Sequence, residues 1–218
     1  MTRLPMLLIL FWGIVISACD SSTSQLGTTY IPTDTTTSFR IRGYWVTPKK
    51  SFDFNTLVKS QEDILHLVTC SEYVYFPFGK LTDKSSLKTS LLKNFTITDC
   101  KRDTFTNIML PSDPSDDFKQ WSESLELEFG QNKLSLFLDN DPDASMHGYL
   151  QGGQIVDSNV VFSDSIKIGI RVEDFYKKFF DYFPAELKYR VIVFESCVKD
   201  VTHIYTFENG KLCNVKFI

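Results

Sequence analysis

The strongest constraint on the fold is an order of patterns that the chain shows twice. In the second half, Gly169 precedes a predicted amphipathic helix, whose apolar residues recur every three or four positions. These residues are Phe175, Phe179, Tyr182 and Phe183. Three strands are predicted next, at 189–197, 203–207 and 211–217. Between the last two lies Asn209-Gly210, a pair that tolerates the positive φ of a tight hairpin turn.

The first half repeats this order. Gly79 precedes a predicted helix with Leu87, Leu91 and Phe95 on one side, and a short strand then ends near Cys100. Strands are predicted at 125–129 and 133–138 around the turn Gly-Gln-Asn, and 104–120 is expected to be a loop insertion. We therefore predict an α+β fold with two tandem repeats of a helix plus a three-stranded antiparallel sheet. Chance similarity of short hairpins is the competing interpretation.

Three elements are expected before the first repeat. Alternation predicts a strand at 38–46, with Phe39, Ile41 and Trp45 on one face. Helical spacing of apolar residues predicts a helix at 54–68, and β-type residues predict a strand at 72–78. The helix assignment depends on Leu57, Ile64, Leu65 and Val68. The expected domains are residues 38–144 for the first repeat with these elements and 145–218 for the second, linked by about 145–165.

The second repeat resembles a known family of envelope lipoproteins. Ile168-Gly169-Ile170 leads into a helix with Glu173 and Asp174 in its first turn. The chain then ends in the pattern Tyr205-x-Phe207-x-x-Gly210-Lys211-Leu212. Together they resemble the small lipoprotein domains of the BamE (SmpA/OmlA) family, and a tandem duplication of such a unit resembles the β-lactamase inhibitor protein. The resemblance implies helices packed on an antiparallel sheet and a protein-binding or assembly role, with no catalytic residues.

The N-terminus has the layout of a secretory signal. Arg3 precedes an apolar run at 6–16, and Ser17 and Ala18 come before Cys19. This run is shorter than the roughly 20 residues that a membrane-spanning helix needs. Residues 16–19, Ile-Ser-Ala-Cys, resemble a lipobox, which implies that residues 1–18 are removed and that Cys19 carries a diacylglyceryl group and palmitate-type acyl chains. In the competing interpretation the signal is an ordinary one and Cys19 is incidental.

Residues 19–37 are rich in Ser, Thr, Asp and Gly and predict a flexible tether. The expected location is therefore the bacterial cell envelope, with the chain held on a membrane by its N-terminal lipid. By resemblance to envelope lipoproteins, Asp20 acts as an inner-membrane retention signal in some lineages, so the choice between inner and outer membrane stays open.

Charge excludes one class of partner. The formal net charge is −4, and the lysines and arginines are interspersed along the sequence without a cluster. This pattern argues against nucleic acid and against a polybasic membrane patch. The expected partners are the membrane, through the lipid, and another envelope protein.

Four cysteines follow Cys19: Cys70, Cys100, Cys197 and Cys213. An exported protein can pair them in two disulfides, but free thiols fit equally well, and the sequence leaves the choice open. Their spacing lacks the paired arrangement of a zinc site, so we expect no metal or other cofactor.

One weak metal candidate is the acidic run Asp139, Asp141 and Asp143, since alternate carboxylates can converge on calcium. Ala144 and Leu150 occupy positions where the EF-hand loop requires glycine and a bidentate acid. The favoured interpretation is a solvated loop.

The sequence shows no complete catalytic set. Cys197 or Cys213 with His203 is a weak thiol–imidazole candidate, and no nucleophile elbow or zinc-helix motif occurs. We therefore expect a membrane-anchored, non-enzymatic protein-binding or assembly module. The alternatives are an envelope hydrolase or thiol enzyme, expected to have a deep polar pocket, and a small-ligand carrier, expected to have a large apolar cavity between sheet and helices.

Overall fold

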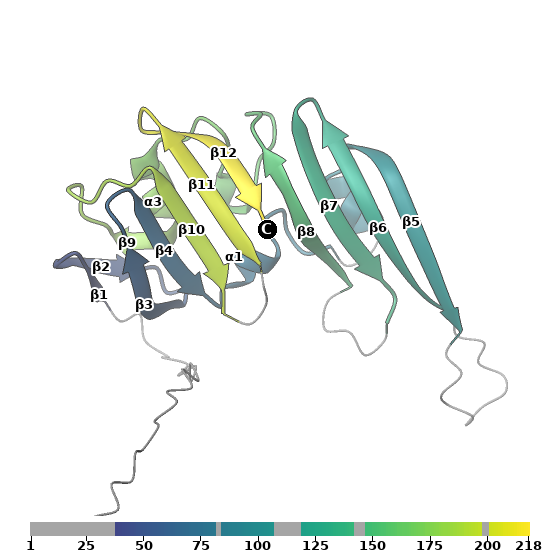
Figure 1. Cartoon of the computed structure of the whole chain (residues 1–218), viewed down its shortest axis with the longest axis horizontal. Helices are drawn as coiled ribbons and strands as arrows, with labels where there is room; N and C mark the ends of the chain where they lie inside the picture. Colours follow the sequence, from purple (N-terminus) through teal and green to yellow (C-terminus); the bar gives the residue numbers. More distant parts are fainter. Residues whose placement is uncertain (1–37, 82–83, 107–118, 142–146, 198–200) are drawn as a thin grey trace, which may run out of the picture. The chain divides into compact units, whose positions relative to one another are not determined.

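The computed structural model describes residues 38–81, 84–106, 119–141, 147–197 and 201–218, all within one compact unit, Pro32–Ile218 (Figure 1). The elements in chain order are β1 (Phe39–Ile41), β2 (Tyr44–Pro48), β3 (Phe54–Ser60), β4 (Ile64–Thr69), α1 (Glu72–Tyr75), α2 (Lys84–Ser90), β5 (Thr96–Thr106), β6 (Lys119–Phe129), β7 (Asn132–Asp139), β8 (Gly148–Ile155), a 3-10 turn (Ser163–Ser165), α3 (Val172–Phe179), β9 (Phe180–Tyr182), β10 (Val191–Ser196), β11 (Thr202–Glu208) and β12 (Lys211–Phe217).

Nine of the strands form one mixed sheet, in the order β3-β4-β10-β11-β12-β8-β7-β6-β5. Strands β1, β2 and β9 form a second sheet, and the helices lie behind the large sheet in the view of Figure 1. The predicted α+β fold with two separate helix-plus-sheet repeats is therefore wrong, because the protein is mostly β. The reason lies at β8, which pairs with β12 through Ile155 and Val215, so that strands from both halves join in one sheet. This pairing satisfies backbone N–H and C=O groups that would stay unpaired at the edges of two separate sheets.

Two predicted hairpins are confirmed. Strands β11 and β12 are joined by Asn209 and Gly210, with φ of 50° and 71°. Strands β6 and β7 are joined by a turn in which Gly130 has a φ of 60°. Both turns use residues that adopt positive φ at little cost, which is why they are readable from the sequence.

The helices predicted after Gly79 and Gly169 are α2 and α3, and both are shorter than expected. The predicted apolar faces are buried where the helices exist, at Leu87 on α2 and at Phe175 and Phe179 on α3. Strand β9 begins directly after Phe179, so Tyr182 lies on a strand and is 56% exposed instead of continuing the helical face.

The predicted helix at 54–68 is wrong, because the segment forms the antiparallel strands β3 and β4. In β4 the burial alternates, with Leu65 and Leu67 fully buried and Ile64, His66 and Val68 half-buried on the other face. Apolar residues on both faces of a short strand produce the same spacing as one face of a helix, so periodicity cannot separate them.

Four other expectations also need correction. The segment 38–46 is a hairpin rather than one strand, because Arg42 and Gly43 have positive φ and turn the chain between β1 and β2. Residues 72–75 form the short helix α1 instead of a strand. The expected linker at 145–165 contains β8, and the loop expected at 104–120 begins after β5 and ends before β6, with 107–118 outside the described residues.

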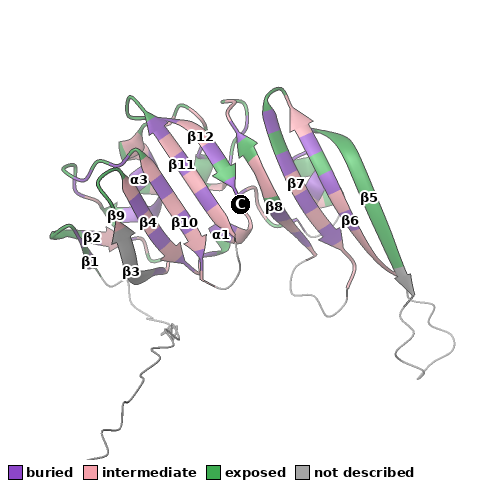
Figure 2. Ribbon diagram, in the orientation of Figure 1, coloured by how far each residue is buried: buried purple, intermediate pink, exposed green. Residues whose placement is uncertain are grey.

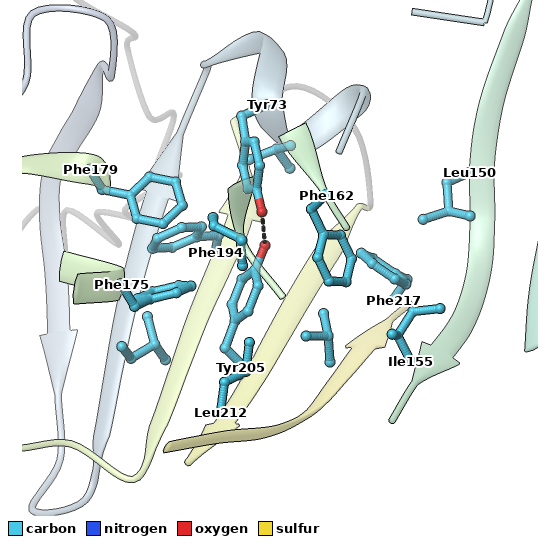
Figure 3. Close-up of a cluster of buried hydrophobic side chains, with 14 of the residues drawn as sticks. Tyr73, Leu150, Ile155, Phe162, Phe175, Phe179, Phe194, Tyr205, Leu212 and Phe217 are labelled. Carbon is cyan, nitrogen blue, oxygen red and sulfur yellow. Dashed lines mark hydrogen bonds between the residues drawn. The ribbon is translucent and has the colours of Figure 1, made fainter. Parts of the chain in front are cut away.

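The core lies between the large sheet and the elements behind it. It is rich in aromatic rings, and Figure 3 shows Phe175, Phe179, Phe194 and Tyr205 packed together. Phe175 lies with its ring centre 4.8 Å from that of Tyr205 and 4.9 Å from that of Phe179. The abundance of phenylalanine in the sequence is thus explained by core packing. In the described part of the chain, none of the helices has the length and apolar character needed to cross a membrane.

Candidate functional site

One face of the large sheet is open in the described part of the chain. Burial alternates along β4, β10 and β11 (Figure 2), and the buried apolar residues of each strand belong to the core cluster that also contains Phe175 and Phe179 of α3. The residues of the opposite face are half-buried and lie outside the core cluster. We call this surface the open face, and its residues are Ile64, His66, Val68, Val191, Val193, Glu195, Thr202, Ile204 and Thr206.

The strand registers make the open face continuous. Val193 of β10 lies opposite His66 of the parallel strand β4 and opposite Ile204 of the antiparallel strand β11. Val191 lies opposite Ile64 in the same way. Five of the nine side chains are aliphatic and occupy three adjacent strands. They make a continuous apolar surface, bordered by two threonines of β11, on a sheet that already has a full core on its other side.

An ionisable pair lies within this apolar surface. The Nε2 atom of His66 is 2.6 Å from Oε2 of Glu195, and the two side chains are 29% and 46% exposed. They come from neighbouring strands, so the sheet fixes their separation. A pair of this kind can orient an incoming partner, because a fixed charge or hydrogen-bonding group favours one register of contact over others.

The sheet changes character beyond β12. Strands β6, β7 and β8 present polar groups on this side, including a hydrogen bond from Ser135 to Glu126 and an ion pair between Lys133 and Glu128 at 2.7 Å. One aromatic contact, Phe137 with Tyr149, interrupts them at 5.2 Å between ring centres. The apolar part of the surface is thus confined to the β4–β10–β11 half.

Two of the four cysteines that follow Cys19 form a disulfide, and the other two are free thiols. Cys70 and Cys197 are bonded, with their Cα atoms 5.1 Å apart. They directly follow the parallel strands β4 and β10, where Thr69 lies opposite Ser196, so the register brings them together. Cys100 on β5 is exposed and free, and Cys213 on β12 is also free.

The weak thiol–imidazole candidate is not assembled. Cys197 is in the disulfide, and His203 lies opposite Phe217 on β12, four positions or about 13 Å along the strand from Cys213. Burial lowers the pKa of His203 to about 3. The pKa of the Cys213 thiol is raised, mainly by burial and to a smaller extent by the negative charge of Glu208. A neutral, fully enclosed imidazole and a protonated thiol are the opposite of an activated pair.

The acidic run is only partly described. Oδ1 of Asp139 accepts the backbone N–H of Asp141 and lies 3.2 Å from Nδ1 of His147. Asp143 lies outside the described residues. Among the residues that the structure describes, no three potential ligands gather in a metal-binding group.

A cleft of about 1080 Å³ opens at the end of the sheet, beside α3 and the segment 183–190. Its wall includes Tyr176 and Tyr189, whose hydroxyl groups are buried without a hydrogen-bond partner among the described residues. Its lining also includes seven charged residues: Asp63, Glu173, Lys177, Asp181, Lys188, Arg190 and Glu208. This charged, open cleft differs from the apolar interior cavity expected of a small-ligand carrier.

Sequence reasoning missed most of the open face. Predicting a helix at 54–68 concealed that Ile64, His66 and Val68 share a strand face. The available signal was 189–197, where valines alternate with core residues so that both faces of the predicted strand are apolar. Cys19 and Asp20 lie outside the described residues.

Comparison of the chain with protein-family models, with curated proteins and with solved structures finds no match.

Proposed function

We propose that the protein is a lipid-tethered, non-enzymatic binding module of the bacterial cell envelope, which binds another envelope protein on its open face. The observation that carries the binding role is the group of five aliphatic side chains on β4, β10 and β11 that lie outside the core. Contiguous apolar surface of this kind is typical of interaction sites in soluble domains.

Two further observations support the location. The lipobox-like residues 16–19 are followed by a Ser- and Thr-rich segment of the kind that separates a lipid anchor from a folded domain. The disulfide between Cys70 and Cys197 is typical of proteins that fold in an oxidising compartment outside the cytoplasm.

The chemistry of the open face indicates what the partner presents. An apolar surface on the partner would cover the valines and isoleucines, and a hydrogen-bond donor or cation would face the half-exposed carboxylate of Glu195. Burial of the five aliphatic side chains supplies affinity, while the His66–Glu195 pair supplies orientation.

Site-specific photo-crosslinking in the native envelope tests this proposal. A benzophenone side chain at Val193 is expected to give one discrete protein adduct. The same group at Lys88, an exposed residue of α2 behind the sheet, is the matched control and is expected to give none. Absence of an adduct from Val193, Ile204 and Ile64 alike would contradict the proposed binding surface.

A second variant separates binding from folding. With the crosslinker at Ile204, the substitution Val193→Asp is expected to abolish the adduct, because it places a charge in the apolar contact. Val193 is only half-buried, so thermal unfolding followed by circular dichroism should stay close to that of the parent protein.

A further inference from the structure

The small sheet formed by β1, β2 and β9 has two contrasting faces. Its inner residues, Phe39, Ile41, Val46 and Phe180, are buried in the core. Its outer face carries Arg40 opposite Trp45 and Thr47 opposite Tyr182, as the strand registers show. The sheet thus covers part of the core on one side and presents aromatic and basic groups on the other.

The small sheet concentrates exposed aromatic side chains. Trp45 and Tyr182 lie on its outer face, whereas Tyr44 pairs with Ile41 at the end of the other face. Among the described residues, six large hydrophobic side chains are exposed, and three belong to this sheet: Tyr44, Trp45 and Tyr182, at 44%, 53% and 56%. The guanidinium carbon of Arg40 lies 4.6 Å from the ring centre of Trp45. Exposed tryptophan and tyrosine with a neighbouring cation are well suited to an interface that is apolar on one side and polar on the other.

Four basic residues lie on or next to the first two strands of this sheet. Arg40 and Arg42 lie on and next to β1, and Lys49 and Lys50 follow β2. The acidic residues near them in the described part of the chain are Asp53, Asp181 on β9, and Glu62, whose backbone carbonyl accepts a hydrogen bond from Arg42. The hairpin therefore gathers an excess of positive charge, whereas the linear sequence indicated no polybasic patch.

The position of this sheet in the chain indicates its occupant. Ser38 directly precedes β1, so the segment from Cys19 to Ser38 enters the fold at this sheet. A chain of this length spans at most about 65 Å even when fully extended. A lipid on Cys19 would therefore keep the outer face close to a bilayer and raise its effective concentration there.

We infer that the outer face of the small sheet, comprising Arg40, Trp45 and Tyr182, together with Arg42 in the adjoining turn, docks on the lipid–water interface of an anionic membrane. The aromatic rings would lie at the headgroup level and the basic side chains would contact lipid phosphates. The inference deepens the proposed function and rests on its lipid anchor. The open face would remain available to the protein partner, because it belongs to the other sheet.

Tryptophan fluorescence tests this docking directly. Trp45 and Trp121 are the tryptophans that follow Cys19, so Trp121→Phe leaves Trp45 as the reporter in the mature chain. The lipidated protein is reconstituted in vesicles of 70% phosphatidylethanolamine and 30% phosphatidylglycerol, with bromine atoms near the headgroup. Quenching of Trp45 is expected to be at least about twofold stronger than that of Trp121 in the reciprocal Trp45→Phe variant.

The charge component is tested on residues 19–218 expressed without residues 1–18 and carrying Cys19→Ser, so that no lipid is attached. Arg40→Ala and Arg42→Ala are each expected to lower its affinity for the phosphatidylglycerol vesicles roughly fivefold, while the exposed Lys88→Ala and Lys93→Ala serve as controls without effect. Equal, weak quenching of Trp45 and Trp121 in protein that still floats with the vesicles would overturn the docking inference. Failure of the proposed anchor would look different, because the protein with Cys19 intact would not float at all.

Discussion

At the residue scale, the core contains a chain of polar side chains among its aromatic rings. The hydroxyl of Tyr205 lies 2.8 Å from that of Tyr73 and 3.1 Å from Nδ1 of His203, and all three residues are buried. The sequence indicated His203 as a weak catalytic candidate, since a histidine opening a strand gives no sign of its burial. The structure shows instead an enclosed imidazole that packs edge-on against Phe217.

The buried His203 predicts acid sensitivity. Its pKa is lowered to about 3 by burial, against about 6.5 in the unfolded chain, so only the unfolded state gains a proton between these values. The free energy of unfolding therefore loses nothing to this histidine well above pH 6.5, and it decreases as the pH falls from 6.5 toward 3. We expect His203 to account for a loss of about 2 kcal/mol between pH 7 and pH 5, measured by urea unfolding.

The control for this prediction is His203→Phe, which cannot titrate. The quantity to compare is the slope of the free energy of unfolding against pH, and not the stability of the variant at pH 7, because the other groups titrate equally in both proteins. A wild-type slope between pH 7 and pH 5 equal to that of the variant would contradict the buried, neutral histidine.

At the element scale, the strands joined by tight turns and strand β10 were predictable, whereas β3, β4 and β8 were not. Asn209-Gly210 identifies the β11–β12 hairpin by local backbone chemistry alone. Strand β8 was concealed, because Gly148, Gly152 and Gly153 within eight residues are typical of a loop. These glycines allow close approach of β7, β12 and the segment before α2, a tertiary requirement that local sequence does not display.

Gly153 is the position where this requirement is strictest. It has a φ of 141°, and a Cβ atom there would collide with the carbonyl oxygen of Lys133 and lie 2.9 Å from Cα of Leu134. We expect Gly153→Ala to lower the free energy of unfolding by about 2–4 kcal/mol, measured by urea unfolding.

The neighbouring Gly152→Ala is the matched control. Its added Cβ would meet only the carbonyl oxygen of Phe217, at an ordinary 3.6 Å, so we expect a change below about 1 kcal/mol. Equal effects of the two substitutions would contradict the close contact between Gly153 of β8 and the backbone of Lys133 and Leu134 on β7.

At the scale of the whole molecule, the prediction of two repeats failed because it treated each half as closed. The pairing of β8 with β12 and of β4 with β10 connects strands that lie far apart in sequence, and neither pairing leaves a local signal. The β4–β10 pairing also creates the open face, since this face requires β4, β10 and β11 side by side. The spacing of the cysteines in the sequence could not predict which of them pair. The parallel register of β4 and β10 brings Cys70 and Cys197 together.

Two surfaces of the molecule have different proposed tasks. The open face of the large sheet would bind the protein partner, while the small sheet beside the tether would contact the membrane. Both tasks depend on attachment of the chain through Cys19, on which the proposed location and the proposed docking rest.

The most direct test of this account is the mass of the N-terminal peptide of the protein isolated from membranes. We predict a peptide that begins at Cys19 and carries a diacylglyceryl group with its acyl chains, and we expect Cys19→Ser to remain uncleaved and unlabelled by palmitate. A mature N-terminus at any other residue, or an unmodified Cys19 in the membrane fraction, would contradict the account.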